Sequence, residues 1–249
     1  PPRELIFSLE DPISFLRQIE KISMSSDTTL NVTIDITTFP RQEMLLIFRY
    51  FDNHPLRGKL RLLYGEPEKY ATESENAEDR WLTRGVTSVH SMPGFSGIQY
   101  PRLNKLLVVI LGHEGERTFI TLRRHQPDKV IFLCQSQSQF HKGLDHISRK
   151  ENENMLAQHG ENCIWDNALS ARGIMETHKE LCKIICQYRS KYNVFVASNG
   201  TKLQLVGTYL AIRNYLEVQA TYASPAVYNW KNYSIGCGPL WEMYLERRS

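Results

Sequence analysis

The stretch that decides the fold runs from Val194 to Tyr228. It begins with the apolar run Val194-Phe-Val-Ala197, passes through the polar loop Ser198-Asn-Gly-Thr-Lys202, and enters an apolar helical stretch from Leu203 to Arg213. A second apolar run, Val218-Gln-Ala-Thr-Tyr222, follows it. A strand, a helix of about ten residues and a second strand in this order predict a β-α-β unit with parallel strands.

The first third of the chain repeats this pattern. The counterparts of the strand, loop, helix and second strand are Val32–Ile36, Thr37–Arg41, Gln42–Phe51 and Leu60–Tyr64. Both copies place a cation, Arg41 or Lys202, at the start of the helix, and both end in the pattern Tyr-x-x-Pro-x-x-Tyr. A short Thr/Ser-x-Gly element then follows each copy, at Thr83-Arg-Gly85 and Ser234-Ile-Gly236. We therefore predict an internal pseudo-twofold β-α-β duplication.

The middle of the chain predicts a third β-α-β unit. The most apolar run, Leu106–Leu111, leads into Gly112-His-Glu-Gly-Glu-Arg117, a helix to about Arg124, and a strand at Lys129–Leu133. Strands that alternate with helices predict an α/β fold with a Rossmann-like, doubly wound, mostly parallel sheet. We expect two Rossmann-like halves, residues 1–105 with an exposed acidic loop and residues 106–249, packed as one compact unit that is a whole protein or part of a longer chain.

Three further elements are expected outside these units. Leu5–Phe7 has the composition of a short strand, and Arg149–Gln158 that of a helix. Asp11-Pro12 combines an N-cap residue with a proline at the first helical position, which predicts the start of another helix.

Composition excludes several classes of protein. The 249 residues are 41% hydrophobic and 23% charged, which is ordinary for a globular protein. The net charge is only +3 and the basic residues are scattered, so no dedicated surface for duplex nucleic acid is expected. Five cysteines without Cys-x-x-Cys spacing argue against a disulfide framework and a zinc site. We expect these cysteines to be reduced thiols of a cytoplasmic protein. No apolar run approaches the roughly 18 residues of a membrane span, so no membrane contact is expected, and neither a metal nor a cofactor is expected.

The candidate ligand site follows from the expected strands. Ligands of open parallel sheets bind beyond the carboxyl ends of the strands, where helix N-termini direct backbone N–H groups at them. The loops at these ends contain the expected ligand-binding residues: Thr37, Thr38, Arg41, Gly112, Arg117, Ser198, Asn199, Gly200, Thr201 and Lys202.

The loop Ser198–Lys202 is the best candidate for binding an anion. Glycine tolerates the backbone geometry of an anion cradle, hydroxyl and amide groups donate hydrogen bonds, and lysine supplies charge. An ordinary tight turn between a strand and a helix is the alternative. The second cationic loop, Thr37–Arg41, favours a ligand with two or more phosphates.

The segment Gly112–Arg117 has the residues for general acid/base chemistry, with His113, Glu114 and Glu116 as candidate catalytic groups and Arg117 as an anion holder. Alternatively, it is a helix start whose carboxylates favour the helix dipole. No second histidine lies at a metal-ligand spacing from His113, which argues against a metal site.

Two further groups leave alternatives open. Asp35, at the end of an apolar strand, is expected to accept a hydrogen bond from its own loop or to pair with Arg41. The tyrosines of the two Tyr-x-x-Pro-x-x-Tyr patterns either stack on a nucleobase or pack the rim of the sheet; they are Tyr64, Tyr70, Tyr222 and Tyr228.

From Asn31 to Tyr228 this layout resembles the CRISPR-associated Rossmann-fold (CARF) sensor domains and the related SAVED domains. The resemblance rests on Ser198–Lys202, on its partner Thr37–Arg41, and on the central Gly112–Arg117. It implies recognition of a cyclic oligonucleotide in bacterial anti-phage defence, together with an effector domain or partner protein.

Three functions remain open from the sequence. The first is a nucleotide-binding or nucleotide-sensing module for a cyclic or multi-phosphate nucleotide. The second is a hydrolase or glycosidase acting on nucleotides or nucleic acid through the acid/base residues of Gly112–Arg117. The third is a protein-interaction subunit of a defence complex. The sequence does not decide whether the chain is an enzyme.

Overall fold

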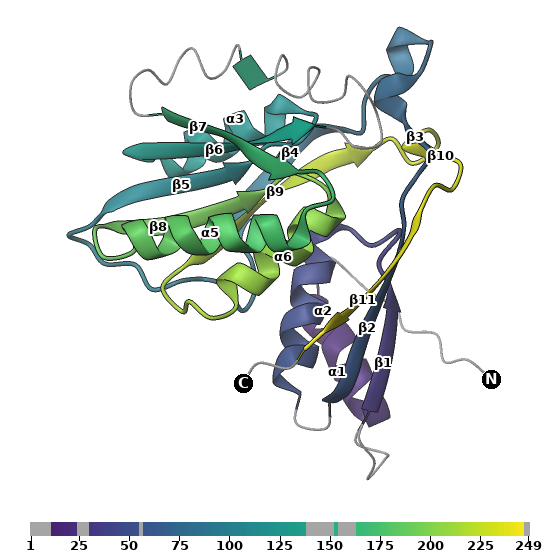
Figure 1. Cartoon of the computed structure of the whole chain (residues 1–249), viewed down its shortest axis with the longest axis horizontal. Helices are drawn as coiled ribbons and strands as arrows, with labels where there is room; N and C mark the ends of the chain where they lie inside the picture. The colour runs from purple at the N-terminus through teal and green to yellow at the C-terminus, as the bar shows by residue number, and fades with distance from the viewer. Residues whose placement is uncertain (1–10, 24–29, 55–56, 138–151, 154–162, 247–249) are drawn as a thin grey trace. The chain divides into compact units, whose positions relative to one another are not determined.

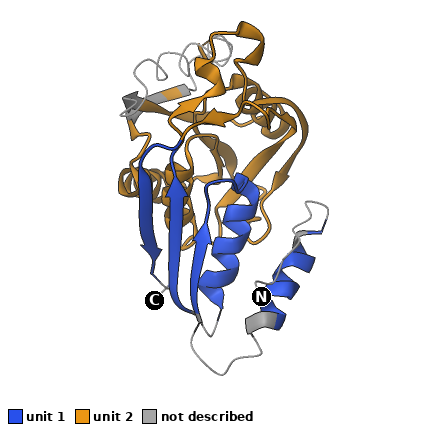
Figure 2. Ribbon diagram, turned by 90° about the vertical axis from the view of Figure 1, so that its right-hand side faces the viewer, with its two compact units in different colours: residues 1–66, 237–249 blue, residues 67–236 orange. Residues whose placement is uncertain are grey.

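The computed structural model of the chain describes residues 11–23, 30–54, 57–137, 152–153 and 163–246 (Figure 1). It has two compact units: unit 1 comprises residues 1–66 and 237–249, and unit 2 comprises residues 67–236 (Figure 2). The expected boundary after residue 105 lies within unit 2. Two halves with that boundary stay a prediction. The expected strand at Leu5–Phe7 and the expected helix at Arg149–Gln158 fall outside the described residues, apart from residues 152 and 153.

Unit 1 contains a three-stranded sheet. β1 (Leu30–Asp35) and β2 (Arg57–Gly65) are parallel, and β11 (Leu240–Leu245) pairs antiparallel with β2. α2 (Arg41–Asn53) connects β1 to β2, and α1 (Pro12–Ser23) precedes β1. The β-α-β unit predicted for the first third of the chain is therefore confirmed.

The start of α1 is also where the sequence predicts it. Asp11 Oδ1 accepts a hydrogen bond from the backbone N–H of Ser14 at 3.1 Å, and Pro12 is the first helical residue. The carboxylate thus satisfies one of the N–H groups that have no partner within the helix.

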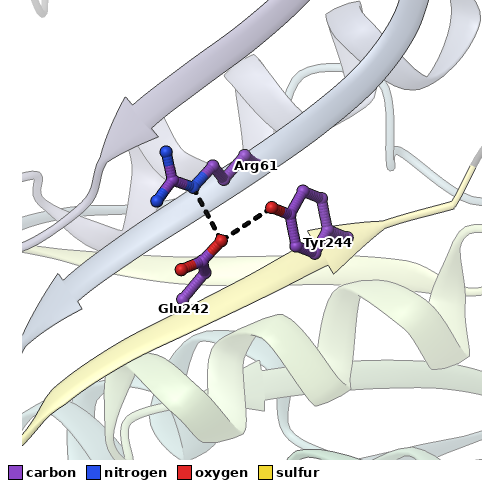
Figure 3. Close-up of polar contacts among 3 residues, drawn as sticks. All are labelled: Arg61, Glu242 and Tyr244. Carbon is purple, nitrogen blue, oxygen red and sulfur yellow. Dashed lines mark hydrogen bonds and ion pairs between the residues drawn. The ribbon is translucent and has the colours of Figure 1, made fainter.

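The sheet of unit 1 has a buried face and an open face. Alternation along β2 buries Leu60 and Leu62, while the side chain of Arg61 between them remains 40% exposed. On the open face, Arg61 Nε donates to Glu242 Oε1 at 2.9 Å, and the Tyr244 hydroxyl donates to the same oxygen at 2.6 Å (Figure 3). Water competes for these exposed groups, so this network between β2 and β11 stabilises the sheet only modestly.

Unit 2 contains a six-stranded sheet in the order β4-β9-β8-β5-β6-β7. Its strands are β4 (Thr83–Ser91), β5 (Asn104–Ile110), β6 (Lys129–Gln137), β7 (Cys163–Ser170), β8 (Tyr192–Ser198) and β9 (Gln219–Tyr228). All neighbours are parallel except β4 and β9. A separate short pairing joins β3 (Lys69–Tyr70) to β10 (Ser234–Ile235). The fold is therefore mixed α/β with a mostly parallel six-stranded sheet.

Three described helices pack on this sheet: α3 (Gly115–His125), α5 (Ile174–Tyr188) and α6 (Lys202–Ile212). Alternate residues of β5, Leu107 and Val109, belong to one buried cluster with Leu122 of α3. The intervening Val108 is also fully buried, so β5 is covered on both faces. The helices α5 and α6 contact each other, and Gly207 permits it because a Cβ there would collide with the carbonyl oxygen of Ile174.

The stretch expected to be an exposed acidic loop, residues 66–80, has some local structure. It contains β3 and two single-turn 3-10 helices, Ala71–Glu73 and Ala77–Asp79. Its acidic residues Glu73, Glu75 and Glu78 are exposed, as expected.

The strand order of unit 2 reverses at β5. From β5 the chain moves outward through β6 to β7, and then returns to the other side of β5 to form β8 and β9. Right-handed crossovers that advance in opposite directions place their helices on opposite faces of a sheet. The loops that leave the carboxyl ends of β5 and β8 therefore lead to helices on opposite faces, and this is where open α/β sheets bind ligands.

β4 follows the first β-α-β unit in the chain, and it pairs with β9, the last strand of the second β-α-β unit. Along β4 and β9, Thr83 lies opposite Tyr228 and His90 lies opposite Tyr222. Seven steps along β4 thus oppose six along β9, so β4 contains one extra residue, a β-bulge. Two residues after Thr83 in this strand, Gly85 has a φ of 66°, in the left-handed region.

β10 and β11 follow the second β-α-β unit in the chain, and they pair with β3 and β2 respectively. Ser234 of β10 lies opposite Tyr70 of β3, and Trp241 of β11 lies opposite Tyr64 of β2. Again seven steps oppose six. Gly236, two residues after Ser234 as Gly85 is after Thr83, has a φ of 72°.

Candidate functional site

The candidate site lies where the loops after β5 and β8 meet. Ile110 and Ser198 pair at the carboxyl ends of these strands, and the backbone N–H of Asn199 donates to the carbonyl oxygen of Ile110 at 2.9 Å. A Cβ on Gly112 would collide with the carbonyl oxygen of Asn199, so this close approach requires glycine. The structure thus brings together Gly112 and Ser198–Gly200, which the sequence assigns to one site.

Polar side chains in the loop after β8 make hydrogen bonds within the protein. The Asn199 side chain donates to the hydroxyl of Thr118 in α3 at 3.3 Å. The Ser198 hydroxyl oxygen accepts from Thr208 in α6 at 3.3 Å. Since both residues are about nine-tenths buried, these contacts fix the loop between the two helices.

The start of α6 is held by a capping box. The N–H of Thr201 donates to Gln204 Oε1 at 2.9 Å, and the N–H of Gln204 donates to the Thr201 hydroxyl oxygen at 3.2 Å. Lys202, half-buried, is the first residue of the helix. A cation at this position opposes the positive end of the helix dipole, and a bound anion would offset that cost.

A third loop, which the sequence analysis missed, supports the capping box. Ser170 ends β7 and Ala171 follows it. Their carbonyl oxygens accept hydrogen bonds from the Gln204 side chain at 3.1 Å and from the Thr201 hydroxyl at 2.5 Å, respectively. The available signal was Ser170-Ala-Arg-Gly173, a small polar turn between a strand and a helix, with the same form as the loop after β8.

Glu114 and Glu116 hold the beginning of β4. Glu114 Oε1 accepts from the backbone N–H groups of Leu82 and Thr83, each at 2.6 Å, and Oε2 accepts from the Thr83 hydroxyl. Glu116 Oε2 accepts from the N–H of Gly85 at 2.9 Å. Both carboxylates therefore act as structural acceptors here. The acid/base role expected for them and for His113 stays a prediction.

Arg117 lies between α3 and β9. Its side chain is almost fully buried, its Nε donates to the carbonyl oxygen of Ala223 at 3.0 Å, and its guanidinium carbon lies 4.8 Å from the ring centroid of Tyr222. These contacts join the helix to the strand. A contact between Arg117 and a ligand stays a prediction.

Three aromatic rings gather beside the loop after β5. The ring centroid of Tyr70 lies 6.0 Å from that of His113 and 6.4 Å from that of Tyr233. Each of the three side chains is half-buried. We call Tyr70, His113 and Tyr233 the aromatic cluster.

The remaining expected ligand-binding residues are in unit 1. Asp35 Oδ1 accepts from the Thr37 N–H at 2.9 Å and from the Thr37 hydroxyl at 2.5 Å, while the hydroxyl oxygen accepts from the N–H of Gly65 at 2.8 Å. The expected bond between Asp35 and its own loop is thus confirmed. Thr38 is exposed and Arg41 is the first residue of α2. Contact of one ligand with this loop and with the loops of unit 2 stays a prediction.

Neither a metal-binding cluster nor a membrane-spanning helix is present in the described part of the chain. No group of three or more histidine, cysteine, aspartate or glutamate side chains in it is arranged to hold a metal ion. No helix in the same residues combines the length and apolar character needed to cross a bilayer.

Comparisons with known proteins include a weak structural similarity. No protein-family model matches the chain, and no curated protein matches it. Among solved structures, the chain is similar to a type III CRISPR defence DNA nuclease activated by cyclic oligoadenylate, with a TM-score of 0.38 and 18% sequence identity. The match covers 57% of this chain and 22% of the nuclease chain. A similarity at this level carries no conclusion about this chain.

Proposed function

We propose that the chain is a nucleotide-binding module whose ligand lies over the loops after β5 and β8. The observation that carries this proposal is the contact between Gly112 and Asn199 at the place where the strand order reverses. Loops that leave neighbouring strands toward opposite faces expose helix N-termini and backbone N–H groups to one ligand. The site therefore suits a ligand that carries phosphate.

The charge of the site supports phosphate as the bound group. Lys202 begins α6, where both the side chain and the helix dipole are positive. Gly200 lies two residues before Lys202. A Cβ at Gly200 would collide with the Gln204 side chain of the capping box, so this position requires glycine. A negatively charged group at this helix start gains from the dipole and from Lys202 together.

We also propose a Rossmann-like, doubly wound fold for unit 2 and an internal duplication of the β-α-β unit. Two strand pairings support the duplication: β4 with β9, and β10 and β11 with β3 and β2. In both, seven steps along one segment lie opposite six along the other, and a glycine with positive φ stands two residues after Thr83 or Ser234. Under this proposal Thr37–Arg41 is the counterpart of Ser198–Lys202. Two cationic loops suit a cyclic or multi-phosphate nucleotide, and an effector domain or partner protein in anti-phage defence would respond to it.

The enzyme reading has less support. A general base has to be available to a substrate, whereas both oxygens of Glu114 already accept hydrogen bonds from β4. No contact among the described residues favours hydrolysis over binding, so we retain binding as the proposed function.

The proposal is tested by replacing Lys202. Isothermal titration with mono-, di-, tri- and cyclic nucleotides, with and without magnesium, should show binding of at least one multi-phosphate nucleotide to the wild-type chain. Lys202→Ala should weaken it by about tenfold or more, because a charge-assisted hydrogen bond to phosphate is lost.

Lys191→Ala is the matched control. Lys191 is also in unit 2 and is exposed, but it precedes the amino end of β8 rather than following its carboxyl end. Its variant should bind as the wild type does. Equal binding by the Lys202 and Lys191 variants, or no binding by the wild type, would contradict the proposal.

A further inference from the structure

We propose that the aromatic cluster is the surface on which the base of the bound nucleotide stacks, an inference that rests on the proposed function. Its rings come from three distant segments: Tyr70 is in β3, His113 follows β5, and Tyr233 directly precedes β10. Convergence of three aromatic side chains with solvent-accessible surface at the end of a sheet provides faces that stack on any nucleobase.

The cluster lies directly beside the proposed phosphate loops. His113 is the residue after Gly112, whose backbone is pressed against the carbonyl of Asn199. A single sugar joins the base of a nucleotide to its phosphate, so the two subsites have to be neighbours. Here Gly112 of the phosphate loops and His113 of the aromatic cluster are adjacent residues.

The ring positions are fixed before any ligand arrives. Tyr70 pairs with Ser234, and the carbonyl oxygen of Tyr233 accepts from the N–H of Ala71 at 3.1 Å. The N–H of Tyr70 in turn donates to Glu73 Oε1 at 2.9 Å. A surface held by backbone pairing loses little conformational entropy when it binds a base.

The segment at the start of β4 is tied to the residue after His113 and contains a cation. Glu114, next to His113, binds the N–H groups of Leu82 and Thr83. Trp81 and Arg84 flank Leu82 and Thr83 in the sequence. The guanidinium carbon of the exposed Arg84 lies 4.4 Å from the ring centroid of Trp81. The segment that Glu114 joins to the loop after β5 thus carries an exposed cation on an aromatic ring.

The experiment compares ATP with tripolyphosphate, which has the phosphates but no base. For wild type, Tyr70→Ala and Tyr70→Phe, affinities are measured by isothermal titration and folding is checked by thermal unfolding. Tyr70→Ala should weaken ATP binding by about tenfold, the effect of removing one stacking ring, and leave tripolyphosphate binding unchanged. Tyr70→Phe, which keeps the ring, should bind both ligands as the wild type does.

Tyr192→Ala is the aromatic control, because Tyr192 lies at the amino end of β8, away from the loops. It should bind ATP normally. Equal loss of ATP and tripolyphosphate binding in Tyr70→Ala would show a structural role and overturn the inference. Unchanged ATP binding would overturn it as well, while leaving the proposed function intact. Absence of ATP binding in the wild-type chain would overturn the inference, whereas the proposed function is decided by the titration with all the nucleotides.

Discussion

Glu43 occupies the third residue of α2, the position that Gln204 occupies in α6. In α6, Gln204 accepts from the N–H of Thr201, the residue before the helix. The corresponding residue in α2 is Pro40, which has no N–H to donate. Glu43 is 1% exposed, its Oε2 has no hydrogen-bond partner among the described residues, and burial raises the pKa of its carboxyl above the ordinary value of 4.5.

Glu43 should therefore make stability depend on pH. Below its ordinary pKa the carboxyl is neutral in the folded and unfolded states, so its burial costs little. As the pH rises, the unfolded chain releases this proton more readily than the folded chain, and stability falls.

Glu43→Gln should raise the melting temperature at neutral pH by a few degrees, since 1 kcal/mol corresponds to about 2–4 °C in a chain of this size. The gain should shrink toward zero near pH 4.5 and below, which thermal unfolding across a pH series measures. Glu75→Gln, at an exposed position, is the control and should show no gain. A gain for Glu43→Gln that is the same at every pH would contradict this account.

At the scale of elements, the pairing of β4 with β9 matches the pairings of β10 with β3 and of β11 with β2. Gly85 and Gly236 both have positive φ, and neither has room for a methyl group without close contacts, to Ala226 Cβ at 3.1 Å and Glu68 Cβ at 2.8 Å respectively. If the pairings are copies of one ancestral element, both glycines occupy equivalent positions in it.

Gly85→Ala and Gly236→Ala should each lower the melting temperature, by roughly 2–8 °C, because a left-handed backbone costs about 1–2 kcal/mol for a residue with a Cβ. Gly65→Ala is the control in β2, since the nearest atom to its added methyl would be 3.5 Å away. It should change the melting temperature little. A large effect at only one of these two glycines would argue against equivalence of the pairings.

Much of the element pattern could be predicted from the sequence, because apolar strands and helix starts leave local signals. Val194–Ala197 and Leu106–Ile110 are strands as expected, and Asp11 caps α1. What local signals do not contain is the partner of each strand. The pairing of β4 with β9 joins residues more than a hundred positions apart, and the matching pairings became visible only from the register.

The candidate site shows the same limit. The closeness of Gly112 to Asn199 could be predicted, because the carboxyl ends of parallel strands share an edge, whereas a ligand site there stays a prediction. The contacts of Glu114, Glu116 and Arg117 could not be foreseen, since their partners in β4 and β9 are remote in sequence. Charged residues at a strand end suggest chemistry, and here they also join α3 and its preceding loop to β4 and β9.

At the scale of the whole molecule, the alternation of strands and helices predicts the mixed α/β class, and the structure has it. The sequence did not predict that residues 237–249 return to unit 1, because β11 joins β2 across most of the chain. The Rossmann-like classification, the duplication and the resemblance to CARF and SAVED domains stay proposals, and the nucleotide-binding function depends on the reversal of strand order at β5.

The measurement that tests this central claim most directly is hydrogen–deuterium exchange of the wild-type chain with and without a bound multi-phosphate nucleotide. Backbone amides that a ligand covers exchange more slowly. We predict slower exchange in 111–115 and 199–203, the loops after β5 and β8, and no change in 190–193 at the opposite edge of the sheet. Binding that leaves exchange in both loops unchanged, with protection elsewhere, would contradict the account.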